Sequence, residues 1–128
     1  MAKTILLVDD DLDYREQMQM QLEAAGYTVN AADSLSEARA LLQKQRFDLA
    51  LVDLMLEEMD GGFTLCYQIK KMDKNIPVLL VTAVTSETGL NFDAATEEER
   101  SWVKADGVLA KPVRFEQLQR EIKRLLKE

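Results

Sequence analysis

Short apolar runs separated by longer segments with helical spacing are the feature that most limits how this chain can fold. Each run has the length of a strand, and the strongest are apolar at consecutive positions, which is typical of strands buried on both faces. The runs are Ile5–Val8, Tyr27–Ala31, Leu49–Val52, Pro77–Val81 and Val108–Ala110. Their alternation with helical segments predicts an α/β fold, with helices on both faces of a five-stranded parallel sheet. The flavodoxin-like strand order 2-1-3-4-5 is the leading candidate.

Between the runs, apolar residues recur every three or four positions, which predicts helices with one buried face. Asp11 suits the cap of the first helix, and Ser34 with Glu37 fits a capping box at the second. A short helix is expected at about 97–104, after a segment at 84–95 that shows no clear period. The helical patterns are Tyr14, Met18 and Leu22; Leu35, Ala38, Leu41 and Leu42; Leu65, Ile69 and Met72; and Phe115, Leu118, Ile122 and Leu125.

Length and charge narrow the class of protein. The chain has 128 residues, which suits one domain spanning 1–128. Its net charge of -7 disfavours direct binding to nucleic acid or to an anionic membrane surface. No stretch approaches the roughly 20 apolar residues of a membrane span, so we expect a cytoplasmic protein without membrane insertion. The single Cys66 and the absence of histidine exclude an internal disulfide and the usual zinc sites.

Polar residues follow the runs at the points where the strands should end. Asp9 and Asp10 follow the first run, Asp53 the third, Thr82 the fourth and Lys111 the fifth. The carboxyl ends of parallel strands meet at one edge of a sheet, so these side chains are expected to share one cleft. Crowded carboxylates repel one another unless a proton or a cation binds between them.

This set of residue types has a use in phosphoryl transfer. Carboxylate oxygens suit Mg²⁺, which commonly binds between one or two carboxylates and a phosphate. A carboxylate beside such a metal can attack phosphorus and form an aspartyl phosphate. A lysine and a threonine could then neutralise or hydrogen-bond the phosphoryl oxygens. The residues therefore predict a metal-dependent phosphoacceptor.

Five segments in order resemble the receiver domain of two-component response regulators across essentially the whole chain: ILLVDDD, LALVDLML, MDGG, PVLLVTA and LAKPV. The resemblance implies that Asp53 is the phosphoacceptor. It also implies that Asp10, Asp53 and the backbone carbonyl of Met55 bind Mg²⁺, and that Asp9 acts through a water molecule. Mn²⁺ is the alternative ion.

The same resemblance assigns the remaining site residues and the partners. Thr82, Ala83 and Lys111 would bind the phosphoryl group and form the switch, and the Lys111–Pro112 bond is expected to be cis. The implied donor is a phosphohistidine on a sensor histidine kinase or a histidine phosphotransfer protein. The resemblance does not specify the output protein, and it allows phosphorylation-dependent homodimerisation. Such a domain assists its own phosphorylation and dephosphorylation but is not an enzyme acting on other substrates.

Three departures from the family pattern concern signalling. Val108 stands where the family usually has an aromatic residue that moves with the threonine. The connection from Thr82 to Lys111 is longer than usual and contains the irregular segment 84–95. Glu57 stands where the family often has a proline, four residues after the phosphoacceptor, and with the following Glu58 it adds negative charge near the site. The switch between the fourth strand and the last helix is therefore expected to be remodelled.

Three other functions are conceivable for the same residues. A receiver kept only as a binding scaffold would explain Val108 and the long connection, but the full acidic, threonine and lysine set argues against it. A phosphatase or phosphomutase with an aspartyl nucleophile needs a second Asp at the position of Met55. A flavin-binding protein would need a phosphate loop rich in Ser, Thr and Gly after the first strand, where the aspartates would instead repel phosphate.

Overall fold

A parallel β-sheet forms the middle layer of the protein. The computed structural model describes residues 3–53, 61–82, 106–110 and 113–127. The helix expected at 97–104 and the segment at 84–95 lie outside these residues. The strands are β1 (Thr4–Val8), β2 (Thr28–Ala32), β3 (Leu49–Asp53), β4 (Val78–Thr82) and β5 (Gly107–Ala110). The helices within the described part are α1 (Leu12–Ala24), α2 (Leu35–Lys44), α3 (Gly61–Met72) and α5 (Phe115–Leu126).

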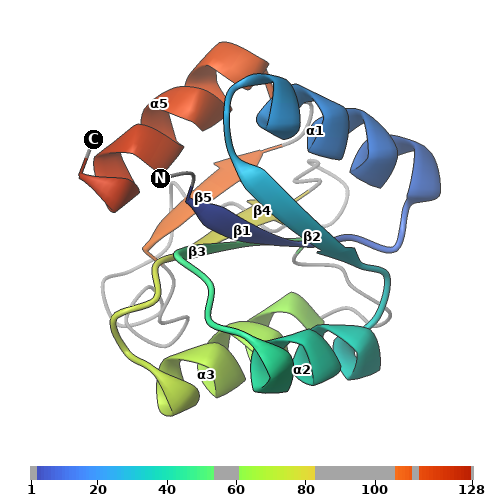
Figure 1. Cartoon of the computed structure of the whole chain (residues 1–128), viewed down its shortest axis with the longest axis vertical. Coiled ribbons are helices and arrows are strands. Elements are labelled where there is room, and N and C mark those ends of the chain that lie inside the picture. Colours follow the sequence, from blue (N-terminus) through green and yellow to red (C-terminus); the bar gives the residue numbers. More distant parts are fainter. Residues whose placement is uncertain (1–2, 54–60, 83–105, 111–112, 128) are drawn as a thin grey trace.

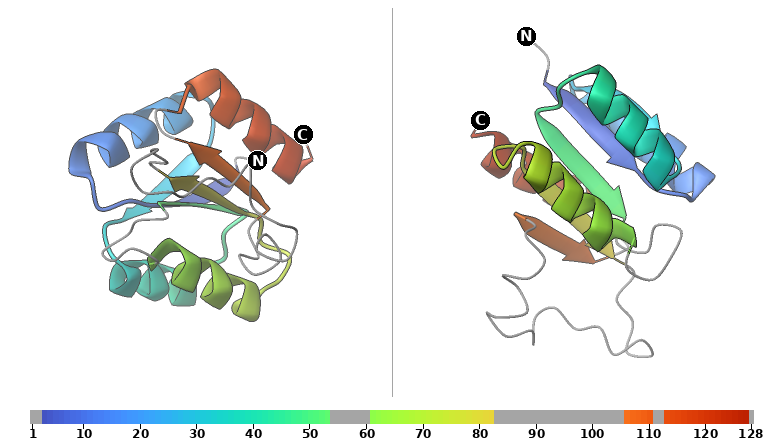
Figure 2. Two further views of the ribbon diagram at one scale, coloured as in Figure 1. Left: turned by 180° about the vertical axis from the view of Figure 1, so that it is seen from behind. Right: turned by 90° about the horizontal axis from the view of Figure 1, so that it is seen from below.

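Three layers are visible in Figures 1 and 2, with α1 and α5 on one side of the sheet and α2 and α3 on the other. The strands are hydrogen-bonded in the order β2-β1-β3-β4-β5, and every neighbouring pair is parallel. The prediction of an α/β fold with a parallel sheet and helices on both faces is confirmed. None of the described helices combines the length and apolar character needed to cross a membrane.

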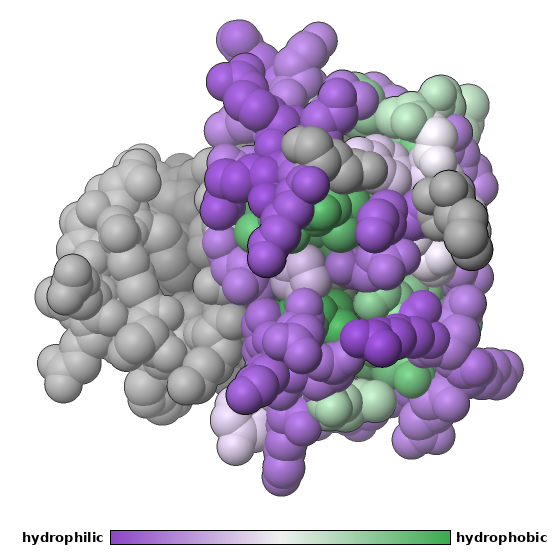
Figure 3. All heavy atoms as spheres, turned by 60° about the vertical axis from the view of Figure 1, so that its left-hand side comes forward, coloured by the Kyte–Doolittle hydropathy of each residue, from purple (hydrophilic) through white to green (hydrophobic). Residues whose placement is uncertain are grey.

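Alternate residues of β1, β3 and β4 enter different cores, because successive side chains of a strand point to opposite faces. In β1, Leu6 and Val8 join the core under α2 and α3, whereas Ile5 and Leu7 join the core under α1 and α5. All four are essentially inaccessible to solvent. This double burial explains why the strands are continuous apolar runs rather than alternating ones. Figure 3 shows the outcome on one side of the molecule, where hydrophilic residues cover most of the described surface.

Side-chain caps begin two of the helices, as the sequence predicted. Asp11 accepts a hydrogen bond from the Tyr14 backbone N–H at 3.2 Å, and Ser34 Oγ accepts one from the Glu37 N–H at 3.1 Å. Each cap satisfies a backbone donor that the first turn of a helix leaves without an intrahelical partner. The cap at Asp11 also fixes where α1 begins relative to the end of β1.

One predicted core position is wrong. Met72 continues the spacing of Leu65 and Ile69 along α3, yet 56% of its surface is exposed while the other two are fully buried. Met72 is the last residue of the helix, so the chain leaves the sheet before this side chain can be covered. Cys66 is buried in the core under α2 and α3.

Gly26 ends the α1 region with a backbone that other residues rarely adopt, at a φ of 102°. Replacement by alanine is expected to lower the free energy of unfolding by about 1–2 kcal/mol, because a Cβ disfavours left-handed backbone. An added Cβ would meet no atom within 4 Å, so the cost comes from the backbone alone. Urea unfolding would measure it. Gly26→Asn should lose less than Gly26→Ala, and equal losses would contradict a backbone origin.

Candidate functional site

The register of the sheet brings two of the predicted aspartates side by side. Val8 of β1 pairs with Val52 of β3, so Asp9 and Asp53 are the next residues along two neighbouring strands. Asp48 fixes the opposite end of the β1–β3 pair through two hydrogen bonds to Thr4. Asp48 Oδ2 accepts from the Thr4 N–H at 2.8 Å, and the Asp48 N–H donates to the Thr4 carbonyl at 2.8 Å. Pairing fixed at both ends leaves the two strands little freedom to slip.

Three carboxylates meet at this carboxyl edge of the sheet. One oxygen from each of Asp9, Asp10 and Asp53 lies within 4.8 Å of the others. Asp9 and Asp53 are buried, with 1% and 6% of their surface exposed, whereas Asp10 is exposed. Burying carboxylates so close together is costly unless a cation compensates the charge. A set of oxygen ligands, open on one side, can hold a divalent ion such as Mg²⁺.

The β1–α1 loop holds Asp9 through its backbone and its side chain. The Asp9 N–H donates to the Ala32 carbonyl at 3.1 Å, and Oδ1 accepts from the Asp11 N–H at 2.9 Å. The guanidinium of Arg15 donates to the Asp9 carbonyl at 2.8 Å. These contacts join the end of β1 to β2 and to the first turn of α1. The acidic cluster is therefore built on a fixed scaffold.

Tyr14 is a site neighbour that the sequence identified only as part of a helical pattern. Its hydroxyl oxygen is buried, and burial, followed by the charges of Asp9 and Asp53, raises its pKa to about 12. The phenol therefore stays neutral beside the carboxylates at physiological pH. Its place four residues after Asp10, on the buried face of the first helix, is the signal that could have pointed to it.

This raised pKa predicts how stability depends on alkaline pH. A tyrosine in the unfolded chain titrates near 10, so between about pH 10 and 12 the unfolded state binds fewer protons at this position than the folded state. The free energy of unfolding should therefore fall as pH rises above 10. Urea unfolding at pH 9 and pH 11 would measure the fall. Tyr14→Phe should show a smaller fall, and an unchanged pH dependence would contradict the assignment.

The structure locates the other predicted residues only in part. Thr82 ends β4, where its backbone pairs with Ala110 of β5, and Val108 pairs with Leu80. Asp53 pairs with Val81, so Thr82 follows directly after the partner of the phosphoacceptor candidate. Five sites that the sequence singled out lie outside the described residues: Met55, the 57–58 glutamate pair, Ala83, Lys111 and Pro112. Their roles stay predictions.

The strand order β2-β1-β3-β4-β5 is that of flavodoxin-like α/β domains, a class that binds ligands at the carboxyl edge where the strand order reverses. In this chain that edge carries the acidic cluster. The sequence matches the response regulator receiver domain over residues 5–123. The chain therefore belongs to the receiver domain family of two-component response regulators, which confirms the resemblance inferred from its motifs.

Individual relatives agree with this assignment. The chain is 37% identical over 122 residues to the transcriptional regulatory protein ZraR of Escherichia coli K12, a match that covers 95% of this chain and 26% of that protein. Overall, the chain spans about a quarter to a half of the length of the curated relatives it matches.

Solved structures show the same fold. A CheY-like receiver domain from Methanospirillum hungatei has a TM-score of 0.82 and 29% identity, covering 99% of this chain and 95% of that one. The response regulator TrrA from Thermotoga maritima, solved in complex with Mg²⁺-BeF, has a TM-score of 0.78 and 26% identity. That match covers 96% of this chain and 98% of TrrA.

Proposed function

We propose that this chain is a phosphoacceptor switch, which takes a phosphoryl group from a partner phosphohistidine onto Asp53 in a reaction that needs Mg²⁺. The observation that carries the proposal is the cluster of Asp9, Asp10 and Asp53, with oxygens within 4.8 Å of one another at the carboxyl edge of the sheet. Membership of the receiver family supports it, as does the Mg²⁺-BeF bound in TrrA.

The proposed ligands are oxygen atoms of residues at or after the carboxyl ends of β1 and β3 in the sequence. Asp10, Asp53 and the Met55 carbonyl would bind Mg²⁺ directly, and Asp9 would bind it through water. Mg²⁺ bound there would offset the negative charge that gathers on the phosphoryl oxygens. The hydrogen bond from Asp11 to Asp9 and the contact from Arg15 to the Asp9 carbonyl keep the loop in place for this role.

In the proposed transfer, an Asp53 oxygen attacks phosphorus, a new O–P bond forms, and the N–P bond of the phosphohistidine breaks with the electron pair going to the imidazole nitrogen. Thr82 and Lys111 would hydrogen-bond or neutralise the phosphoryl oxygens. Water would later hydrolyse the acyl phosphate and restore the carboxylate. The domain thus assists its own modification and reset, and is not an enzyme with an external substrate.

The proposed signal is a change between β4 and α5 that alters partner affinity. Val108 on β5 departs from the aromatic residue usual in the family, so a different coupling between Thr82 and the output surface is proposed. The donor would be a sensor histidine kinase or a histidine phosphotransfer protein. The output partner would be a protein that binds the phosphorylated form more tightly than the unphosphorylated form. A second copy of the chain is one such partner.

Intact mass after incubation with acetyl phosphate and Mg²⁺ tests the proposal. The wild type is expected to gain one phosphoryl group, and both EDTA and Asp53→Asn should abolish the gain. Circular dichroism would show that the variant remains folded. No gain in a wild type that binds Mg²⁺ would reject the phosphoacceptor and leave a receiver that acts only as a binding scaffold.

A further inference from the structure

A hollow at the C-terminal end of α3 combines an exposed aromatic ring with three cations. It has a volume of about 340 Å³ and is lined by Tyr67, Lys70, Lys71 and Lys74. Tyr67 has 56% of its surface exposed, and Lys71 and Lys74 are also exposed. Because α3 connects two parallel strands, it ends at the opposite edge of the sheet from the acidic cluster. The hollow is therefore separate from the proposed phosphorylation site.

Lys70 forms a fixed part of this hollow. Its side chain is only 15% exposed, and Nζ lies 2.6 Å from Asp106 Oδ2 and donates to the Ile76 carbonyl at 2.8 Å. Asp106 Oδ2 also accepts from the Val78 N–H at 2.8 Å. This network joins α3 to the starts of β4 and β5. A binding surface built on it is organised in advance, which lowers the entropy cost of binding.

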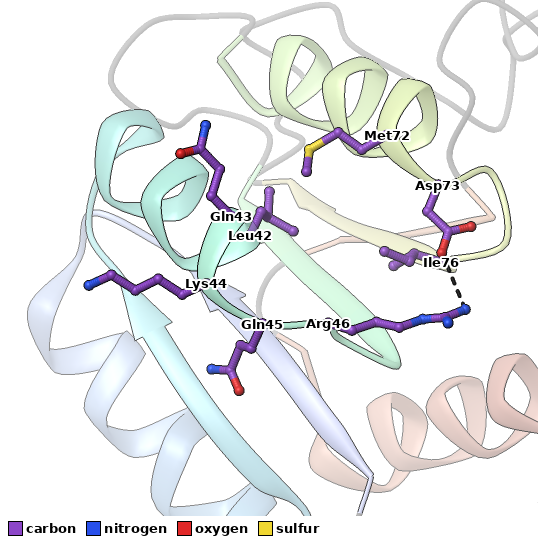
Figure 4. A pocket seen from close by; sticks show the side chains of 8 residues that line it. All are labelled: Leu42, Gln43, Lys44, Gln45, Arg46, Met72, Asp73 and Ile76. Atoms are coloured by element: carbon purple, nitrogen blue, oxygen red, sulfur yellow. Dashed lines mark ion pairs between the residues drawn. The ribbon is translucent and has the colours of Figure 1, made fainter.

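In the described part of the chain, two acidic residues near the hollow, Asp73 and Asp106, are already paired. Asp73 forms an ion pair with Arg46 at 3.3 Å, and Figure 4 shows its carboxylate turned toward that residue. Asp106 is paired with Lys70. Lys71 and Lys74 make no ion pair with any acidic residue in the described part of the chain. Among the described residues, positive charge thus collects here, in a chain whose net charge is -7.

We propose that this hollow binds an acidic segment of a partner protein. The carboxylates of this segment would face Lys71 and Lys74, and one of its apolar side chains would cover Tyr67. Tyrosine is a residue type enriched at binding hot spots. The last turn of a helix favours cations by itself, but the helix dipole does not account for a hollow walled by an exposed tyrosine. Nucleic acid is the less suitable polyanion, because the acidic remainder of the chain would repel its long backbone.

Fluorescence anisotropy with a labelled peptide tests the proposal on the unphosphorylated full chain, so the result does not depend on Asp53. The probe is fluorescein-Glu-Glu-Leu-Glu-Glu-Leu-Glu-Glu, and the matched control peptide has Lys in place of Glu. We expect saturable binding of the acidic probe only, weakening as salt screens the charges. The double variant Lys71→Glu/Lys74→Glu should bind it about tenfold more weakly or worse.

A second double variant controls for net charge. Lys123→Glu/Lys127→Glu makes the same charge change at exposed positions in and after α5, and should bind within about threefold of the wild type. Tyr67→Ala should also weaken binding. Circular dichroism of each variant confirms folding.

Two results with the acidic probe would overturn the proposal: no saturable binding by the wild type, or an equal loss of binding in both double variants. Equally tight binding of a poly-dT oligonucleotide that also depends on Lys71 would overturn it in favour of nucleic acid. Sedimentation showing that the hollow instead joins two copies of the chain would also overturn it.

Discussion

Asp10→Asn is expected to weaken Mg²⁺ binding by about a hundredfold or more. Losing even an outer partner of a metal ligand commonly costs about 10- to 100-fold in affinity, and Asp10 is proposed as a direct ligand. The exchange keeps the size of the side chain and removes one of three charges that lie within 4.8 Å of one another. Isothermal titration calorimetry of the wild type and the variant would measure the difference.

The same variant should change stability in a way that separates charge from packing. Without metal, removing one carboxylate relieves repulsion in the folded state, so the free energy of unfolding should stay equal or rise. With Mg²⁺ at a hundred times its Kd, the wild type should gain about 2.7 kcal/mol, whereas the variant should gain almost nothing.

Asp13→Asn is the matched control, since Asp13 is exposed in the first turn of α1 but lies outside the cluster. It should keep the full response to Mg²⁺. An equal loss of Mg²⁺ binding in both variants would mean that the ion responds to general acidity and not to the three-carboxylate site.

The acidic cluster could be predicted because its geometry follows from strand ends. Once the runs at 5–8 and 49–52 are strands of one parallel sheet, the residues that follow them must meet at one edge. The register then gives the detail, since Val8 pairs with Val52 and places Asp9 beside Asp53. The position of the cluster depends on no long-range side-chain contact, so the sequence pattern is sufficient to predict it.

Contacts between distant side chains could not be predicted in the same way. The pairing of Lys70 with Asp106 joins residues that are 36 positions apart. Between them lies the segment 84–95, for which the sequence shows no clear period. Similarly, the periodicity of α1 showed that Tyr14 faces inward but not that its hydroxyl lies near the charges of Asp9 and Asp53. Both depend on the exact position of a helix end over the sheet, which spacing alone does not determine.

Helix periodicity also fails where a helix ends. Leu65 and Ile69 are buried as predicted, but Met72 is exposed because a repeat of three or four residues carries no information about the point at which the neighbouring element stops. In α2, Ala38 and Leu42 are buried, whereas Leu35 is only partly covered. Spacing therefore identifies the buried face, and the ends of the partner strands decide how far along the helix that face extends.

Phe47→Ala is expected to cost about 3–5 kcal/mol of folding free energy, the largest stability change among the variants considered. Phe47 has 1% of its surface exposed and packs in the core under α2 and α3, two residues before the start of the strand that ends in Asp53. Truncating a buried phenylalanine removes its transfer energy and leaves a cavity. Since domains are commonly stable by only about 5–15 kcal/mol, urea unfolding should show a much lower midpoint.

Met20→Ala is the control, because Met20 is 71% exposed and its truncation should change stability by less than about 0.5 kcal/mol. A loss below about 1 kcal/mol for Phe47→Ala would mean that the core closes over the cavity.

The Phe47→Ala variant also separates the effect on folding from the effect on phosphorylation. Phe47 precedes the start of β3, whereas Asp53 is the last residue of that strand. At a temperature where Phe47→Ala is folded, this variant should therefore still accept one phosphoryl group. Asp10→Asn should do the reverse, keeping the fold and losing the metal-dependent reaction.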